Sequence, residues 1–267
     1  MKKFSTIAFR SFKIFIGELT SVAAGIYVGV QEALPSINGL DSTDPWNIVA
    51  KKHEIVLNGL KSERVLGSAI RLNLVSLYSG FDLFVSDIRC QFYELHGKEW
   101  QQHDGDAPFV ALKRNTPSSH PDHEERLGKG RIASMDYYRL VRNAIAHPKD
   151  EATAAAKRYY LENKVLLSEV AAVYGMKSAP NQIDALNFHD IKYLARLALD
   201  LASAVDQDFD PGDVRLATFI PTHFFGLPKS QKRIDNARIG WLKEKYGVKQ
   251  DRAERILSLH KGSLAQR

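Results

Sequence analysis

The residues from Ser62 to Leu95 have one long helical pattern. Apolar side chains recur there at steps of three, four and seven residues, the spacing that places them on one face of an α-helix. They are Leu66, Ala69, Ile70, Leu77, Phe81, Phe84, Ile88, Phe92 and Leu95. Such a segment needs other helices to cover its apolar face, so we expect it to be the central core helix, with Gly80 as a bend.

The rest of the chain also has helical periodicity, and no strand alternation or internal repeat competes with it. Asp44 and Pro45 are a typical N-cap and first helical residue. Asn187 caps a strong helix whose apolar face runs from Ile191 to Val205, with Asp190 at its third position. Further helices are expected at about 45–60, 131–147, 150–164, 166–174, 230–246 and 250–260. A short strand is expected at 214–220. The pattern predicts an all-α helical bundle.

We divide the chain into three parts. Residues 1–44 form an N-terminal helical segment, 45–227 form the bundle, and 228–267 form a basic C-terminal extension of two helices. A polar stretch at 97–130 interrupts the bundle. Insertions of this length are usually functional or mobile, so both substrate contact and disorder remain open for it.

Composition limits the compartment. Of the 267 residues 44% are hydrophobic, which excludes a disordered chain, and the single cysteine, Cys90, cannot form an internal disulfide. The longest uncharged run near the N-terminus, 19–31, is shorter than the ~20 residues that span a bilayer. We therefore expect a cytoplasmic protein without a membrane segment.

The positive charge lies mainly in the C-terminal extension. Residues 228–267 contain 11 Lys and Arg against 4 Asp and Glu, whereas the whole chain has 37 against 31. Contact with nucleic-acid phosphates is one interpretation, and an ordinary solvated helical face is the other. The candidate nucleic-acid-binding residues are Lys229, Lys232, Arg233, Arg238, Lys243 and Lys245.

The end of the helix expected at 131–147 has the residues for phosphate chemistry. Arg142, Asn143 and His147 form an R-x4-H pattern that stops at Pro148. An arginine offsets charge that develops on a phosphate, and a histidine transfers protons near neutral pH. The residue before a proline is pushed out of α geometry, so we expect His147 to turn toward Arg142. A structural role for both side chains, in pairing with an acid and capping the helix, is the alternative.

Three other arginine–histidine pairs have similar spacing. Arg114 and His120 enclose a proline in the polar stretch, and Arg255 and His260 lie in the basic extension without a polar residue after the arginine. Arg89 and His96 are seven residues apart on the long helix and share a face, which makes them the second choice. Only the pair at 142–147 combines a polar neighbour with a helix that ends at the histidine.

No metal or cofactor site is expected. Several metal-ligand residue types occur in the polar stretch, but their spacing matches no rigid motif. These residues are His103, Asp104, Asp106, His120, Asp122, His123 and Glu124. Glycine-rich phosphate loops and the motifs of serine hydrolases and zinc proteases are also lacking from the sequence.

The segment from Arg142 to Pro148, at the end of an amphipathic helix in an all-α chain, resembles the R-x4-6-H signature of the HEPN superfamily. The likeness extends over about residues 45–208, and its specific part is the motif itself. It implies a metal-independent endoribonuclease of a toxin–antitoxin or antiphage-defence system. By this resemblance Arg142 would bind the phosphate, Asn143 would orient the pair, and His147 would be the general acid and base, with Asp82, Ser86 or Asp87 as further contacts of Arg142.

The resemblance also implies partners. RNA would be the substrate, two copies would form a homodimer with a composite cleft, and an antitoxin or other regulatory protein would restrain the activity. A second hypothesis remains open beside it. In that hypothesis the chain is a non-catalytic helical protein that binds nucleic acid, or acts as a regulatory sensor, through the basic extension at 228–267.

Overall fold

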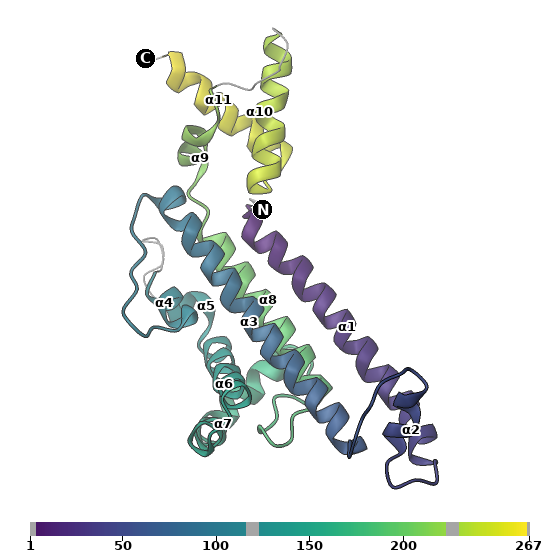
Figure 1. Ribbon diagram of the computed structural model, residues 1–267. Coiled ribbons are helices and arrows are strands. Elements are labelled where there is room, and N and C mark those ends of the chain that lie inside the picture. The colour runs from purple at the N-terminus through teal and green to yellow at the C-terminus, as the bar shows by residue number, and fades with distance from the viewer. Residues whose placement is uncertain (1–3, 116–122, 223–229, 266–267) are drawn as a thin grey trace. The chain divides into compact units, whose positions relative to one another are not determined.

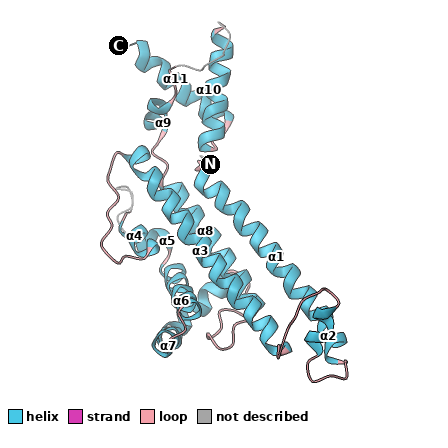
Figure 2. Ribbon diagram, viewed as in Figure 1, coloured by secondary structure: helices cyan, strands magenta, loops and turns pink. Residues whose placement is uncertain are grey.

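The structure is a computed structural model that describes residues 4–115, 123–222 and 230–265. Eleven helices and no strand occur in these ranges, which confirms the all-α class (Figures 1 and 2). The helices are α1 (Ile7–Asn38), α2 (Pro45–Lys51), α3 (Ser62–His96), α4 (Pro108–Arg114), α5 (His123–Leu127), α6 (Lys129–Ala146), α7 (Asp150–Val173), α8 (Phe188–Asp208), α9 (Asp213–Phe219), α10 (Gln231–Tyr246) and α11 (Gln250–Ala265).

The helices assemble into two compact units. Unit 1 consists of Met1–Lys13, Asp82–Arg126 and Leu201–Arg267, and unit 2 consists of Ile14–Phe81 and Leu127–Asp200. Each unit is built from segments that are distant in the sequence, because α1, α3 and α8 each contribute to both. The division of the chain at residues 44 and 227 follows chain order instead, and it stays a prediction.

The core of unit 2 comes from the amphipathic faces of α3, α6 and α8. Its largest fully buried side chains include Leu77, Phe81, Tyr137, Tyr138 and Tyr193, each at most 1% exposed. Burial of such faces drives helices together, since each large apolar side chain removed from water contributes about 1.5–3 kcal/mol. The periodicity that predicted these three helices therefore reflects their packing.

Two glycines of unit 2 allow close packing. A Cβ on Gly130 would lie 2.4 Å from Cγ2 of Val170, so α6 approaches α7 at this point. A Cβ on Gly80 would lie 2.3 Å from Cε1 of Phe15. The structure thus gives Gly80 a different role from the expected bend, because the Phe15 ring occupies the space a larger residue would need.

Asn187 and Asp190 begin α8 with reciprocal hydrogen bonds. Asn187 Oδ1 accepts a hydrogen bond of 2.8 Å from the backbone N–H of His189, and the backbone N–H of Asn187 donates to Asp190 Oδ2 at 2.9 Å. This arrangement is a capping box, which satisfies N–H groups that the helix itself leaves unpaired. The predicted cap is confirmed.

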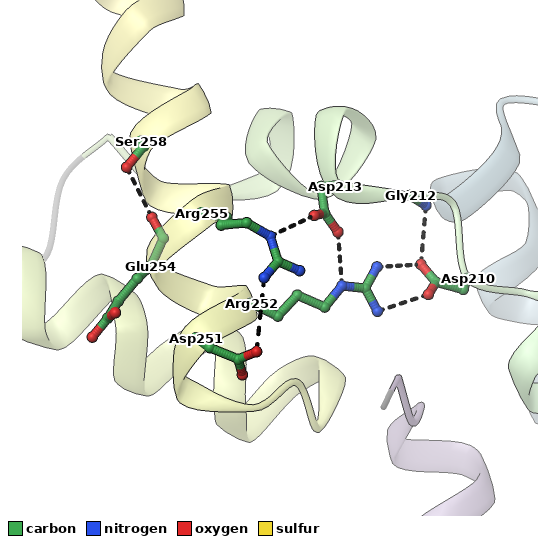
Figure 3. A network of polar contacts seen from close by, with 8 residues as sticks. All are labelled: Asp210, Gly212, Asp213, Asp251, Arg252, Glu254, Arg255 and Ser258. Atoms are coloured by element: carbon green, nitrogen blue, oxygen red, sulfur yellow. Dashed lines mark hydrogen bonds and ion pairs between the residues drawn. The ribbon is translucent and has the colours of Figure 1, made fainter. Parts of the chain in front are cut away.

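A charged network joins α9 and α11 in unit 1. Arg252 of α11 donates two hydrogen bonds of 2.7 Å to Asp210 and a third of 2.7 Å from Nε to Asp213 (Figure 3). Its side chain is 3% exposed. Nearby, the ring of His260 contacts the carbonyl of Ala217 at 3.0 Å through Nδ1. These contacts link the last helix to the segment that follows α8.

Three expected elements differ from the structure. The strand expected at 214–220 is wrong: Asp213–Phe219 is the helix α9, in which Leu216 and Ala217 are buried while Val214 is 73% exposed. The helix expected at 45–60 ends at Lys51, because the chain turns to a left-handed conformation at Glu54 (φ 60°). The two helices expected at 150–164 and 166–174 are one helix, α7. Val165, expected to separate them, is an exposed residue within it.

α1 bears on the expected location of the protein. Among the described residues it is the one helix that is long and apolar enough to cross a membrane, and 11% of its apolar window is buried. The sequence analysis considered only the uncharged run 19–31. The apolar part of α1 is longer than that run, because a helix that crosses a membrane tolerates an occasional charged residue such as Glu18. A cytoplasmic location stays a prediction.

Candidate active site at the end of α6

α6 ends where the sequence motif requires. The backbone of His147 has left helical geometry (φ −130°, ψ 78°), and its N–H still donates a hydrogen bond of 2.9 Å to the carbonyl of Asn143. Pro148 accounts for this change, since it excludes the helical conformation at the preceding residue. The imidazole is exposed. The backbone of His147 thus leaves the helix, whereas the expected turn of its side chain toward Arg142 stays a prediction.

Arg142 is held in place by its neighbours. It is half-buried, its Nη1 donates a hydrogen bond of 2.9 Å to Asn143 Oδ1, and its guanidinium carbon lies 5.5 Å from the centroid of the Tyr78 ring. A guanidinium over an aromatic face gains electrostatic attraction from the ring. Two contacts therefore fix the direction of this side chain, and the one to Asn143 has the geometry expected of an orienting residue.

The three motif residues are arranged in two parts. Arg142 and Asn143 are joined by their hydrogen bond, and His147 follows five residues later at the solvent-exposed helix end. In the described part of the chain no hydrogen bond joins the side chains of Arg142 and His147.

Tyr78 is a site residue that the sequence analysis missed. It lies on α3 and is 1% exposed, so its ring forms a rigid surface under Arg142. It belongs to the same apolar stripe as Leu77 and Phe81, and this position in the stripe is the one feature of the sequence that could have indicated Tyr78. The contacts expected from Asp82, Ser86 and Asp87 stay predictions, because those residues belong to unit 1 whereas Arg142 belongs to unit 2.

The second-choice pair has other partners. Arg89 donates a hydrogen bond of 2.5 Å from Nη1 to Gln102 Oε1. The ring of His96 packs against Phe92 and Phe209, with centroids 5.2 and 5.4 Å away, and burial, followed by the charges of Lys98 and Arg215, lowers its pKa. The two side chains thus contact different parts of unit 1.

The remaining arginine–histidine pairs are involved in structural contacts. Arg114 forms an ion pair with Asp106, and His120 lies outside the described residues. Arg255 lies 3.6 Å from Asp213, and His260 is buried against α9. The described residues of these two pairs therefore have structural partners, and the choice of the pair on α6 stays a prediction.

The candidate nucleic-acid-binding residues of the tail fall into two groups. Lys232 and Arg233 are exposed on α10. Arg238 is buried and donates to the carbonyl of Thr222 at 3.4 Å, whereas Lys243 donates to Gln250 at 3.3 Å. Lys245 donates to Glu94 at 2.7 Å. Lys229 lies outside the described residues.

Lys245 also contacts aromatic rings. Its Nζ lies 5.4 Å from the centroids of both Trp241 and Tyr246. Both rings belong to unit 1, and Tyr246 is 3% exposed, so its ring is buried within the fold.

Within the polar stretch at 97–130, Asp106 is engaged in contacts with neighbouring residues. Asp106 accepts hydrogen bonds from Arg114 and from the backbone N–H of His103, and these lower the pKa of Asp106 to about 2. No group of three or more His, Cys, Asp or Glu that could hold a metal ion occurs among the described residues. His120 and Asp122 lie outside them, and so do the side chains of His123 and Glu124.

Comparison with known proteins adds no relative. No family model, no curated protein and no solved structure matches the chain.

Proposed function

We propose that the protein is a metal-independent endoribonuclease whose catalytic residues are Arg142, Asn143 and His147. The observation that supports this proposal most is the hydrogen bond from Arg142 to Asn143, one turn before a histidine that Pro148 has released from α6 into solvent. A fixed cation and an accessible imidazole are the two groups that cleavage by the 2′-hydroxyl of RNA requires.

In the proposed reaction the 2′-oxygen attacks the neighbouring phosphorus, and the bond to the 5′-oxygen breaks. A neutral His147 imidazole accepts the 2′-hydroxyl proton, and an imidazolium donates a proton to the leaving 5′-oxygen. Arg142 stabilises the negative charge that builds up on the phosphate oxygens, held at the correct angle by Asn143. The products are a 2′,3′-cyclic phosphate and a 5′-hydroxyl.

The resemblance of the motif to the HEPN superfamily extends the proposal to context. A role as a toxin or antiphage effector, a homodimer, and an antitoxin or other restraining partner are all part of it. In a homodimer, two copies of His147 would supply the base and the acid at the same time.

The test is cleavage of total RNA and of tRNA by the full chain in excess EDTA, with the product ends mapped. We expect the wild type to leave cyclic phosphate ends, and His147→Ala and Arg142→Ala to lose about 10²–10⁴-fold in rate. His53→Ala, which removes another exposed histidine of unit 2, serves as the matched control and should cut normally. Equal cleavage by wild type and His147→Ala would place the chemistry elsewhere, and Arg89 and His96 would be the next pair to test by substitution.

Binding of nucleic acid without cleavage is the second candidate, and the exposed cations Lys232 and Arg233 favour it. Removing residues 228–267 would be a poor test, because Leu242, Tyr246 and Ile256 are buried in unit 1. The double variant Lys232→Glu/Arg233→Glu is sharper. It should abolish RNA binding if the tail is the functional surface, and leave cleavage within a few-fold if the site on α6 is.

A further inference from the structure

One face of α1 exposes apolar side chains to solvent. Within unit 2, the residues Ile14, Val22 and Val28 are 63%, 57% and 57% exposed, and Phe15 and Ile26 are 40% and 42% exposed. Glu18 is the one charged residue between Ile14 and Gln31. Scattered exposed apolar residues are normal on a protein surface. Ile14, Val22 and Val28, however, lie on one side of a single helix and are each more than half exposed, which favours a partner there.

The opposite face fixes α1 to unit 2. Ile16, Ala23 and Ile37 are at most 5% exposed, and the ring of Tyr27 stacks on Phe188 with centroids 4.8 Å apart. The helix is therefore already packed along one side. Ile14, Val22 and Val28 lie on the other side. The ring of Phe15 packs beside Gly80, and Ile26 lies at the edge of the packed side, near Leu66 and Ile70.

Small residues form a row along this exposed side. Gly17, Ser21, Gly25 and Gly29 recur at every fourth position, and all four are exposed. A Cβ on any of the three glycines would meet no heavy atom within 4 Å. The Ser21 hydroxyl donates to the carbonyl of Gly17 at 2.9 Å, so it needs no outside partner. Because three of its four residues have no side chain, this row, called the groove below, allows another helix backbone to approach closely.

Ridges border the groove. With 100° between successive residues, Val22 and Ile26 project on one side of the row and Val28 on the other. Rows at four-residue spacing are the ridges and grooves that interlock when two α-helices pack in the commonest way. A helix with both a groove and adjoining ridges at this spacing complements a copy of itself.

We propose that this α1 face, defined as Ile14, Gly17, Ser21, Val22, Gly25, Ile26, Val28 and Gly29, pairs with the same face of a second copy of the chain in antiparallel orientation. The helices would cross midway between Ser21 and Gly25, so that Gly17 of one copy lies opposite Gly29 of the other.

Charge selects the antiparallel arrangement. The exposed residues Lys13 and Glu32 stand at the two ends of the face and have opposite signs. Antiparallel pairing places Lys13 of one copy beside Glu32 of the other and separates the two Glu18 side chains by about 15 Å, at 1.5 Å of rise per residue. Parallel pairing would put Lys13, Glu18 and Glu32 each opposite its own copy.

The size of the face sets the expected strength. Residues 13–32 span about 29 Å, and with a contact width of about 10 Å each copy buries roughly 300 Å². Stable interfaces bury about 800 Å² per partner, so a weak and reversible dimer is expected from this face. The proposed face consists of α1 residues alone, so Arg142 and His147 of α6 are not among the residues that define it.

Sedimentation velocity of the full chain over a wide concentration range tests the proposal. The wild type should associate, and Gly25→Leu should raise the dissociation constant at least about tenfold, since the added side chain fills the groove. The same change should raise the melting temperature of the monomer, because leucine favours a helix interior more than glycine and the space is open. If Gly25→Leu instead lost association because it unfolds the protein, the melting temperature would fall. Gly240→Leu, at an exposed and equally open position in α10, is the matched control.

Charge reversal tests the orientation. Lys13→Glu and Glu32→Lys should each weaken association about threefold at low salt, and the double variant should recover it, as expected for a surface ion pair. A lipid surface is the other occupant that such a face suggests. Binding to phosphatidylcholine vesicles that is stronger for Gly25→Leu than for wild type would overturn the proposal, because lipid gains from a larger apolar residue.

Two further outcomes would also overturn it. A wild type that stays monomeric at every concentration would do so, and it would equally contradict the homodimer of the proposed function. A Gly25→Leu variant that associates normally would overturn the α1 pairing alone, and this result does not depend on RNA cleavage. His147→Ala should associate like the wild type, so failure of this proposal and failure of the proposed function are distinguishable.

Discussion

The hydroxyl of Tyr138 donates a hydrogen bond of 2.9 Å to Oδ1 of Asp190, and both side chains are buried. The same carboxylate accepts hydrogen bonds of 2.9 Å from the backbone N–H groups of Asn181 and Asn187 and from the Asn181 amide. Burial raises the pKa of Asp190, and these four donors oppose that effect. One acidic side chain therefore connects α6, the start of α8 and the segment before it.

Asp190→Ala should lower the free energy of unfolding by about 3 kcal/mol, because it leaves several buried donors without an acceptor. Tyr138→Phe removes only one of the four donors and should cost about 1 kcal/mol. Urea denaturation followed by circular dichroism measures both. Equal effects of the two substitutions would show that the carboxylate does not organise this part of unit 2.

Asp206 should make stability depend on pH. Its carboxylate accepts hydrogen bonds from the N–H and hydroxyl of Thr6, and burial raises the pKa of Asp206 to about 6. The folded state therefore binds this proton more tightly than the unfolded chain. The stabilisation is present below about pH 4 and is lost as the pH rises through about 6, by up to about 3 kcal/mol.

The measurement is the unfolding free energy of wild type and Asp206→Asn between pH 4 and pH 7. Asparagine keeps the acceptor oxygen and has no charge, so the difference between the proteins should change across this range in favour of the variant. Asp41→Asn, at an exposed acid, is the control and should follow the wild type. A constant difference for Asp206→Asn contradicts the prediction.

Arg252→Met should destabilise the contact of α9 with α11 by about 3–5 kcal/mol. The substitution leaves Asp210 and Asp213 without their shared cation in a site where the arginine side chain is 3% exposed. Arg255→Ala removes a neighbour that is 53% exposed and should cost about 0–1 kcal/mol. Hydrogen exchange of the α9 and α11 amides, together with thermal unfolding, tests both values.

Gly130→Ala should cost about 1–3 kcal/mol, because the added methyl group would lie 2.4 Å from Val170 at the approach of α6 to α7. Gly67→Ala in α3 is the counterpart with nothing within 4 Å, and it should gain about 0.5–1 kcal/mol from helix propensity. Opposite signs in thermal unfolding are expected. If both substitutions stabilise the protein, α6 and α7 must lie farther apart at Gly130 than the structure places them.

Asn143 tests the orienting role in the proposed reaction. Asn143→Asp keeps the oxygen that accepts from Arg142 and should retain cleavage, whereas Asn143→Leu removes it and should reduce the rate about 10- to 100-fold. RNA binding should change little in either variant. If the leucine variant cleaves as fast as the aspartate variant, the hydrogen bond has no part in the chemistry.

Periodicity predicted the helices that bury a continuous face, because burial itself produces the pattern. α3, α6 and α8 were predicted in this way. The helix expected at 230–246 ends at Tyr246 as α10, and Gly247 follows in a left-handed conformation (φ 60°). The pattern failed at α9, which has seven residues and too few turns to show a period.

The residues of the candidate site also differ in how far the sequence alone could relate them. Arg142, Asn143 and His147 are close in sequence, so their relation was visible in the motif. Tyr78 under Arg142 and Glu94 beside Lys245 come from distant parts of the chain, and only the folded structure pairs them.

The ion pairs of the tail affect how the protein should behave during purification. Glu94, Asp210 and Asp213, which pair with tail cations, lie outside residues 228–267, and unit 1 as a whole has 21 Lys and Arg against 17 Asp and Glu. The other residues of unit 1 have 10 Lys and Arg against 13 Asp and Glu, so they offset three of the seven excess positive charges of the extension. A synthetic peptide of residues 228–267 should elute from a heparin column at a higher salt concentration than the intact protein.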